Sequence, residues 1–245
     1  MHLVCSTLWL PKKGNTAEEY EDAAAPLDPI DKDTDVFRCA VADGATETSF
    51  SRTWAKLLVE GYVERTARAT LKERWADSIS GKQLAWYAEE KAQSGAFAAL
   101  VGLQINDCAD GGTRTWVCEA LGDSCLILVR GKSFVEQFPL THSDEFNSSP
   151  ILISSSSPDG EAEEELIAKS GEWQPGDIFY LLSDAIARWT YKRQEDYGDA
   201  SVWLKSMTHG ADFDAFVELQ RELTDAEMRP LMRNDDVTLM RVELT

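Results

Sequence analysis

Five aspartates stand where apolar, strand-like segments of the chain begin or end, and carboxylates in such places can bind a hard cation. They lie beside Gly, Ser, Ala or Asn and not within runs of charge, and they are Asp22, Asp43, Asp123, Asp184 and Asp235. Any one of them is most simply explained as a turn residue. If the strands converge in one sheet, however, the five carboxylates would meet at one rim, where they repel one another unless a cation neutralises them.

The pair Asp43 and Gly44 is the centre of this pattern. A β-prone apolar segment, residues 35–42, precedes the pair, and an amphipathic pattern begins at Phe50. Gly44 has no side chain, so a ligand can approach its backbone carbonyl closely. A carboxylate next to an accessible carbonyl is ligand chemistry for a hard divalent cation. Asp-Gly is also a common turn, so the prediction depends on the other carboxylates.

The apolar patterning predicts a chain rich in strands. We expect strands over residues 2–9, 36–42, 97–105, 133–140, 178–182 and 237–244. Two further β-rich runs, residues 115–121 and 124–129, are separated by a short turn, and we expect them to form a tight hairpin.

Helices are predicted in blocks between these strands. The spacing of Phe50, Trp54, Leu57, Leu58 and Tyr62 indicates a helix over residues 50 to about 79, with a break near Gly61. Other helices are expected over residues 82–94, 186–192, 200–207 and 213–223. Blocks of helices among hairpin strands are typical of an α+β fold with an antiparallel core. Residues 141–165, rich in Ser, Pro and Glu, predict a flap or mobile loop within a single domain of residues 1–245.

Composition limits the class of protein. The 245 residues carry a net charge of −19, which argues against nucleic acid and membrane surfaces as partners because both require a positive footprint. The five cysteines include no C-x-x-C pair, and we interpret them as reduced thiols of a cytoplasmic protein. The apolar start lacks the basic region of a signal peptide, and no run is long enough to span a membrane.

The order of the motifs resembles the metal-dependent type 2C protein phosphatase family, and in particular its bacterial stand-alone members. The matching segments are residues 21–23 (Glu-Asp-Ala), 41–44 (Val-Ala-Asp-Gly), 96–102, 121–124 (Leu-Gly-Asp-Ser), 175–184 and 235–238 (Asp-Asp-Val-Thr). Each motif is short, but their order and intervals match over residues 3 to 244, which is nearly the whole chain.

This resemblance implies a fold and a metal site. The fold would be a four-layer α-β-β-α sandwich with two central antiparallel sheets and the metal site at one end. Two Mn²⁺ or Mg²⁺ ions would bind there, and many bacterial members carry a third. Carried over by position, Asp43 would bridge both ions, and Asp184 and Asp235 would hold the first; these three form the expected catalytic set. The Gly44 carbonyl and either Glu21 or Asp22 would bind the second ion, and Asp123 with Asp184 would match the third.

The implied activity is hydrolysis of phosphoserine or phosphothreonine in a protein substrate by a monomeric serine/threonine phosphatase. Mg²⁺ and Mn²⁺ take oxygen ligands, and two such ions roughly 4 Å apart activate a bridging hydroxide for in-line attack on phosphorus. No protein nucleophile is then required, which agrees with a sequence that has no Cys-based phosphatase loop.

Two positions depart from the family pattern. The early arginine that binds phosphate is absent around Thr16, so Lys12 or Lys13 is the candidate phosphate-binding residue, with Arg52 and Arg188 as alternatives. The usual histidine after Asp-Gly is replaced by Ala45-Thr46-Glu47, and the nearest alternative acid is His142. These departures leave open a pseudophosphatase that acts as a regulatory binding module, and a small-molecule phosphatase on the same fold.

Overall fold

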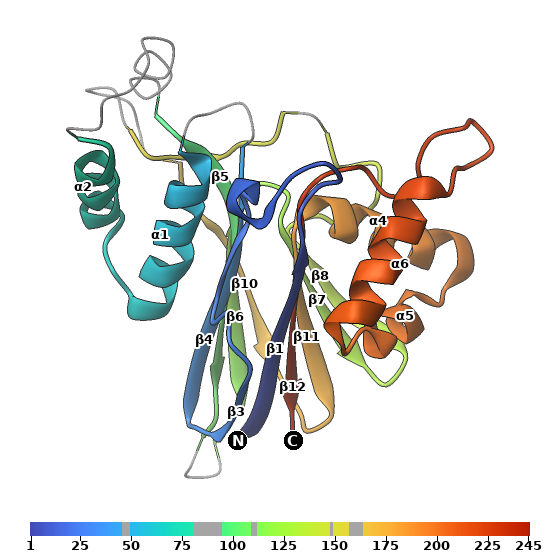
Figure 1. The fold of residues 1–245 in the computed structure, drawn as a ribbon. Helices are drawn as coiled ribbons and strands as arrows, with labels where there is room; N and C mark the ends of the chain where they lie inside the picture. The colour runs from blue at the N-terminus through green and yellow to red at the C-terminus, as the bar shows by residue number, and fades with distance from the viewer. Residues whose placement is uncertain (46–49, 81–94, 109–111, 148, 157–163) are drawn as a thin grey trace.

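Two six-stranded antiparallel sheets form the centre of the computed structural model, which describes residues 1–45, 50–80, 95–108, 112–147, 149–156 and 164–245 (Figure 1). The first sheet has the order β3 (Ile30–Asp33), β1 (His2–Leu10), β12 (Val237–Leu244), β11 (Asp177–Leu182), β7 (Cys125–Arg130) and β8 (Ser133–Phe138). The second sheet has the order β10 (Ile167–Glu172), β6 (Thr115–Leu121), β5 (Phe97–Asn106), β4 (Val36–Gly44) and β2 (Ala23–Ala25), and β9 (Ile153–Ser154) pairs with β5.

Helices cover the outer face of each sheet (Figure 1). Helices α1 (Ser51–Glu64) and α2 (Arg68–Ile79) pack on the second sheet, where Trp54 and Leu58 join one apolar cluster with Ala40 and Ala42 of β4. Helices α4 (Asp184–Tyr197), α5 (Ala200–Ser206) and α6 (Gly210–Glu222) pack on the first sheet. A short 3₁₀ helix, η1 (Ala17–Glu19), precedes β2. The structure confirms the expected four-layer α-β-β-α sandwich.

Strand β11 shows how the layers are held together. Its six residues are all buried, and the last five, residues 178–182, alternate between two apolar clusters. Phe179 and Leu181 face the second sheet, whereas Ile178, Tyr180 and Leu182 face the helices. A strand covered on both faces is apolar along its length, and residues 178–182 have this pattern. The buried Asp177 at the start of the strand is paired with Arg130 of β7.

The expected hairpin between residues 115–121 and 124–129 is wrong. Strand β6 pairs with β5 and β10 in the second sheet, whereas β7 pairs with β11 and β8 in the first. The chain crosses between the sheets at Gly122, which has a φ of +97°. The inward residues of the two strands, such as Cys118 of β6 and Leu126 of β7, therefore meet across the inter-sheet core. A local turn signal does not distinguish strands that pair edge to edge from strands that face each other.

The expected helix over residues 50–79 is two helices, and the chain breaks after α1 at Arg65, whose φ is +62°. Gly61 lies within α1, where a Cβ atom would come within 2.5 Å of Leu71. The glycine therefore allows α2 to pack closely instead of ending the helix. The helix expected over residues 82–94 lies outside the described residues.

The segment expected to be a flap, residues 141–165, contributes β9 to the second sheet. Ile153 is fully buried, and Trp54 Nε1 donates a hydrogen bond of 2.8 Å to its carbonyl. Residues 157–163 of this segment lie outside the described part of the chain, so a flap there stays a prediction. Strand β3 (Ile30–Asp33) is an additional strand that the apolar patterning did not predict.

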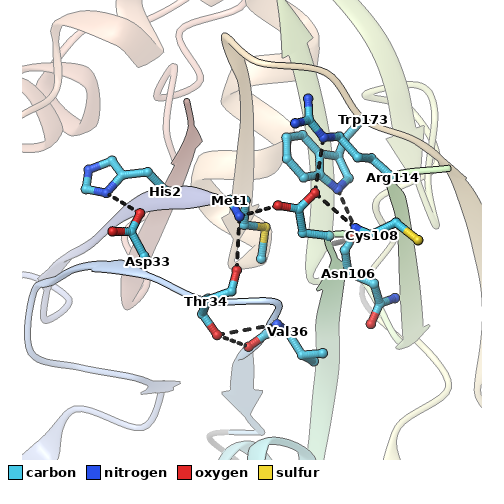
Figure 2. Close-up of polar contacts among 10 residues, drawn as sticks. Met1, His2, Asp33, Thr34, Val36, Asn106, Cys108, Arg114 and Trp173 are labelled. Atoms are coloured by element: carbon cyan, nitrogen blue, oxygen red, sulfur yellow. Dashed lines mark hydrogen bonds and ion pairs between the residues drawn. The ribbon is translucent and has the colours of Figure 1, made fainter. Parts of the chain in front are cut away.

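The two chain termini lie together at one end of the sandwich (Figure 1). The Met1 amino group donates a hydrogen bond of 3.2 Å to the Thr34 carbonyl and contacts the Asp107 carboxylate, to which Arg114 also donates (Figure 2). Polar side chains therefore close this end of the two sheets. None of the described helices is long and apolar enough to cross a bilayer.

The burial of the cysteines generates a test of the fold. Four thiols, those of Cys5, Cys39, Cys118 and Cys125, are buried, and burial raises the pKa of Cys5 and of Cys125 to about 12. Cys108 is exposed. Because the thiolate is the reactive form, we expect iodoacetamide at mildly alkaline pH to modify Cys108 alone in the folded protein and all five thiols after unfolding, as measured by mass spectrometry. Rapid modification of any buried thiol in the native state would contradict the sandwich packing.

Candidate metal centre

Strand register brings the five predicted aspartates to the end of the sandwich opposite the termini. Asp43 pairs with Ala99 near the end of β4, and Asp22 directly precedes β2, whose Ala23 pairs with Ala42. Asp123 follows β6, Asp184 follows β11, and Asp235 precedes β12. Because neighbouring strands run antiparallel, these starts and ends of strands lie on the same side.

Electrostatics show that the five carboxylates form one group. Burial raises the pKa of Asp43 well above its usual range, and the charges of the other four aspartates raise it further. Burial, followed by the charges of Asp184 and Asp235, raises the pKa of Asp123 to about 7. The structure therefore places all five residues that the sequence singled out at the same end of the sandwich, near enough for their charges to interact.

Asp22 is the most deeply buried of the five. Thr238 Oγ1 donates a hydrogen bond of 2.7 Å to Asp22 Oδ2, and the Thr238 hydroxyl also contacts the hydroxyl of Tyr20. Asp22 Oδ1 is buried with no hydrogen-bond partner. Burial raises the pKa of this carboxyl well above its usual range.

Asp184 occupies the first position of α4, and Ala185 after it adopts helical backbone without a positive φ. Arg233 Nη1 donates a hydrogen bond of 3.1 Å to Asp184 Oδ2 and lies 4.0 Å from Asp235 Oδ2. Asp184 Oδ1 is buried with no hydrogen-bond partner. Burial, followed by the charge of Asp235, raises the pKa of Asp184.

Glu21 and Gly44 complete the predicted set. Ser51 Oγ donates a hydrogen bond of 2.7 Å to Glu21 Oε1, and Lys12 Nζ lies 3.7 Å from Glu21 Oε2. A Cβ atom on Gly44 would lie 2.8 Å from the Glu21 carbonyl oxygen. Only glycine lets these two backbone segments approach, which places the Gly44 backbone beside the acidic group.

The chemistry of this group fits a divalent metal ion. Its ligand atoms are all oxygens, as Mg²⁺ and Mn²⁺ prefer, and the buried unpartnered oxygens of Asp22 and Asp184 lack the partner that a buried polar atom requires. Among the described residues, no three His, Cys, Asp or Glu side chains converge as a preformed ligand set. Protein donors, Thr238 and Arg233, hold two of the carboxylates instead, so a metal ion at Asp184 competes with Arg233.

Two residues of the site were missed by the sequence analysis. Asp236 is buried, and its carboxylate accepts hydrogen bonds from the backbone N–H groups of Lys12 (2.8 Å) and Glu21 (2.6 Å). These two hydrogen bonds connect the segment before β2 to the start of β12. Arg233 was missed because it stands outside the Asp-Asp-Val-Thr motif, and only its position two residues before Asp235 could have indicated it.

The candidate phosphate-binding residues have different surroundings. Lys12 lies beside Glu21 at the site, whereas Lys13 Nζ pairs with Glu222 (3.1 Å) and Glu218 (3.8 Å) on α6. Arg52 donates to the Glu18 carbonyl. His142 is exposed, and its Nδ1 lies 3.8 Å from Glu195 of α4.

A groove of about 1360 Å³ opens from this acidic group along α4. Its walls are α4, residues 142–147 and the segment between α6 and β12, and it includes Asp184, Arg188 and Arg233. Arg188 is exposed one helical turn after Asp184. The groove therefore joins a cluster of carboxylates to at least two guanidinium groups, an arrangement suited to a phosphorylated ligand.

Comparison with known proteins agrees with this geometry. The family model described as "Protein phosphatase 2C" matches residues 19–233. No curated protein sequence matches the chain.

Among solved structures, the serine/threonine phosphatase PstP/Ppp of Mycobacterium tuberculosis aligns with a TM-score of 0.63 and 13% identity, covering 100% of this chain and 99% of that one. PppA of Pseudomonas aeruginosa aligns with a TM-score of 0.55 and 18% identity over 100% and 99% of the two chains. RsbX, solved with magnesium, aligns with a TM-score of 0.51 and 21% identity over 100% and 96%. The family model covers most of the chain, and the fold is shared throughout, so this chain belongs to the protein phosphatase 2C family.

Proposed function

We propose that this protein is a metal-dependent phosphatase that hydrolyses phosphoserine or phosphothreonine in proteins. The observation that carries the proposal is the group of five carboxylates, in which Asp22 and Asp184 each keep one buried oxygen without a hydrogen-bond partner. Two structural neighbours support the metal: PstP is described in complex with two manganese ions, and RsbX in complex with magnesium.

The residues divide into two proposed ligand groups. Asp43 would contact two Mn²⁺ or Mg²⁺ ions. Asp184 and Asp235 would bind the first ion. Asp22 or Glu21, together with the Gly44 carbonyl, would bind the second ion. Asp123, beside Asp184, is the candidate for a third ion. When bound, the metal ions would supply an activated water nucleophile and neutralise charge on the phosphoryl group.

The protein itself would position these groups and the substrate. Asp236 holds the backbone of Lys12 and Glu21 against β12, which fixes the Glu21 carboxylate at the edge of the site. Thr238 orients Asp22 through its hydroxyl. The groove along α4 would receive the phosphorylated segment of the substrate, with Arg188 near the entrance to the acidic group. Preorganised charges of this kind account for much of the rate of phosphoryl transfer.

The buried, unpaired cysteines are compatible with a reducing compartment, and we propose a cytoplasmic location. We also propose that the protein acts as a monomer, because the sandwich described here builds every ligand of the site from one chain.

Turnover tests this function directly. We expect Mn²⁺-dependent release of phosphate from phosphoserine and phosphothreonine peptides, and a loss of kcat on the order of a hundredfold or more for Asp43→Asn, because the variant lacks the carboxylate shared by both ions. Asp31→Asn is the matched control, since Asp31 is an exposed carboxylate of β3 that pairs with Val4, and it should leave kcat within twofold. Equal turnover by Asp43→Asn and the wild type, or none by the wild type with any divalent metal, would refute the proposal.

Metal binding is also expected to change stability. Five crowded carboxylates repel one another, so Asp43→Asn should raise the melting temperature of the chelator-treated protein at neutral pH. In the wild type, Mn²⁺ should raise the melting temperature in a concentration-dependent way because it binds only the folded state, and Asp43→Asn should lose most of this increase. Differential scanning calorimetry measures both effects. A variant that is less stable than the wild type after chelation, yet equally stabilised by Mn²⁺, would contradict the assignment of Asp43.

A further inference from the structure

Arg233 stands at the boundary between the acidic group and the groove. One of its guanidinium nitrogens donates to Asp184 and lies 4.0 Å from Asp235. The side chain is 51% exposed and lines the groove, so part of it is open to the space that a substrate would occupy. A guanidinium carries five donors in a planar fork, and only one of them is used by the carboxylates of Asp184 and Asp235 within hydrogen-bond distance.

The basic residues near the start of the chain, which the sequence suggested as phosphate-binding, are less suited to this contact. Lys13 pairs with two glutamates of α6, and Arg52 donates to the Glu18 carbonyl. Lys12 lies beside Glu21 and presents a single ammonium, which lacks the bidentate geometry of an arginine toward phosphate. Within the part of the chain that the structure describes, Arg233 is therefore a fork-shaped donor that hydrogen-bonds directly to a proposed metal ligand.

Arg233 and a divalent cation compete for the same carboxylate. A metal ion that takes Asp184 as a ligand removes the partner of Arg233 and places a like charge beside the guanidinium. The free guanidinium then needs a new anionic partner, and the phosphoryl group of a substrate in the groove is an acceptor with matching bidentate geometry.

We propose that Arg233 is an exchangeable counter-ion that passes from Asp184 to the substrate phosphoryl group when metal binds. Arg233 thus provides the phosphate contact for which this chain has no arginine in its early acidic motif. The exchange makes metal binding and phosphate binding mutually favourable, since each ligand removes the cost of displacing Arg233 for the other. This inference rests on the proposed phosphatase function and adds its phosphate-binding residue.

Calorimetric titration of the full chain tests the exchange without relying on turnover. We expect Arg233→Gln to bind Mn²⁺ roughly three- to fivefold more tightly than the wild type, because a partly exposed competing ion pair is removed. Inorganic phosphate should bind the Mn²⁺-loaded variant about tenfold more weakly, because a charge-assisted hydrogen bond is lost. Arg229→Gln is the matched control: Arg229 lies on the same segment but pairs with Asp225 and Glu227, and neither affinity should change.

Arg233→Lys separates charge from shape. It keeps the positive charge that competes for Asp184 but lacks the planar fork. We expect Mn²⁺ affinity close to that of the wild type and phosphate affinity close to that of Arg233→Gln. Circular dichroism spectra and melting temperatures of all variants would confirm that each one folds.

Two results would overturn the exchange. Unchanged or weaker Mn²⁺ affinity in Arg233→Gln would show that Arg233 does not compete with the metal. Tighter Mn²⁺ binding with unchanged phosphate affinity would show that Arg233 does not pass to the phosphate. Failure of the proposed function appears differently, as wild-type protein that releases no phosphate from any phosphopeptide with any divalent metal.

Discussion

The mutual repulsion of five carboxylates at one end of the sandwich is the constraint on which the site depends. Burial, and then the charges of neighbouring aspartates, raises the pKa values of Asp22, Asp43, Asp123 and Asp184, because both disfavour the ionised carboxylate. The packed apolar layers below the site hold the strand ends in place against the repulsion. A divalent cation at the proposed site would offset this repulsion by neutralising the carboxylates.

The two sheets have different parts in building this cluster. The second sheet and its connections contribute Asp22, Asp43 and Asp123, whereas the first sheet contributes Asp184 and Asp235 at the ends of β11 and β12. Hydrogen bonds across the layers fix the two halves: Thr238 of β12 donates to Asp22, and Asp236 accepts from the backbone of Glu21. The site therefore requires correct packing of one sheet on the other, and not only correct folding of each.

The net charge of −19 would repel the phosphorylated partner proposed for this protein. The groove beside the acidic group offers local hydrogen-bond donors that would offset this repulsion. Overall charge acts over long distances and is screened by salt, whereas recognition depends on local donors. Arg188 and Arg233 supply such donors within a few residues of Asp184 and Asp235 along the chain. The guanidinium groups of Arg188 and Arg233 that line the groove come from α4 and the segment before β12. In the β1–β2 connection, Lys12 pairs with Glu21 of the acidic group, and Lys13 pairs with Glu222 of α6.

The amino-acid sequence by itself determined the fold class and most strands, and it singled out five aspartates that the structure places at one end of the sandwich. Apolar periodicity and the residues that end it are local properties of the chain, which is why they can be read from the sequence. It did not determine that β6 and β7 face each other across the core, since a turn at Gly122 fits a hairpin or a crossing between sheets equally well. Nor did it identify Arg233 or Asp236. Their importance comes from partners far along the chain, Asp184 for Arg233 and the backbone of Lys12 and Glu21 for Asp236, and only tertiary packing of the two sheets brings these groups within hydrogen-bond distance.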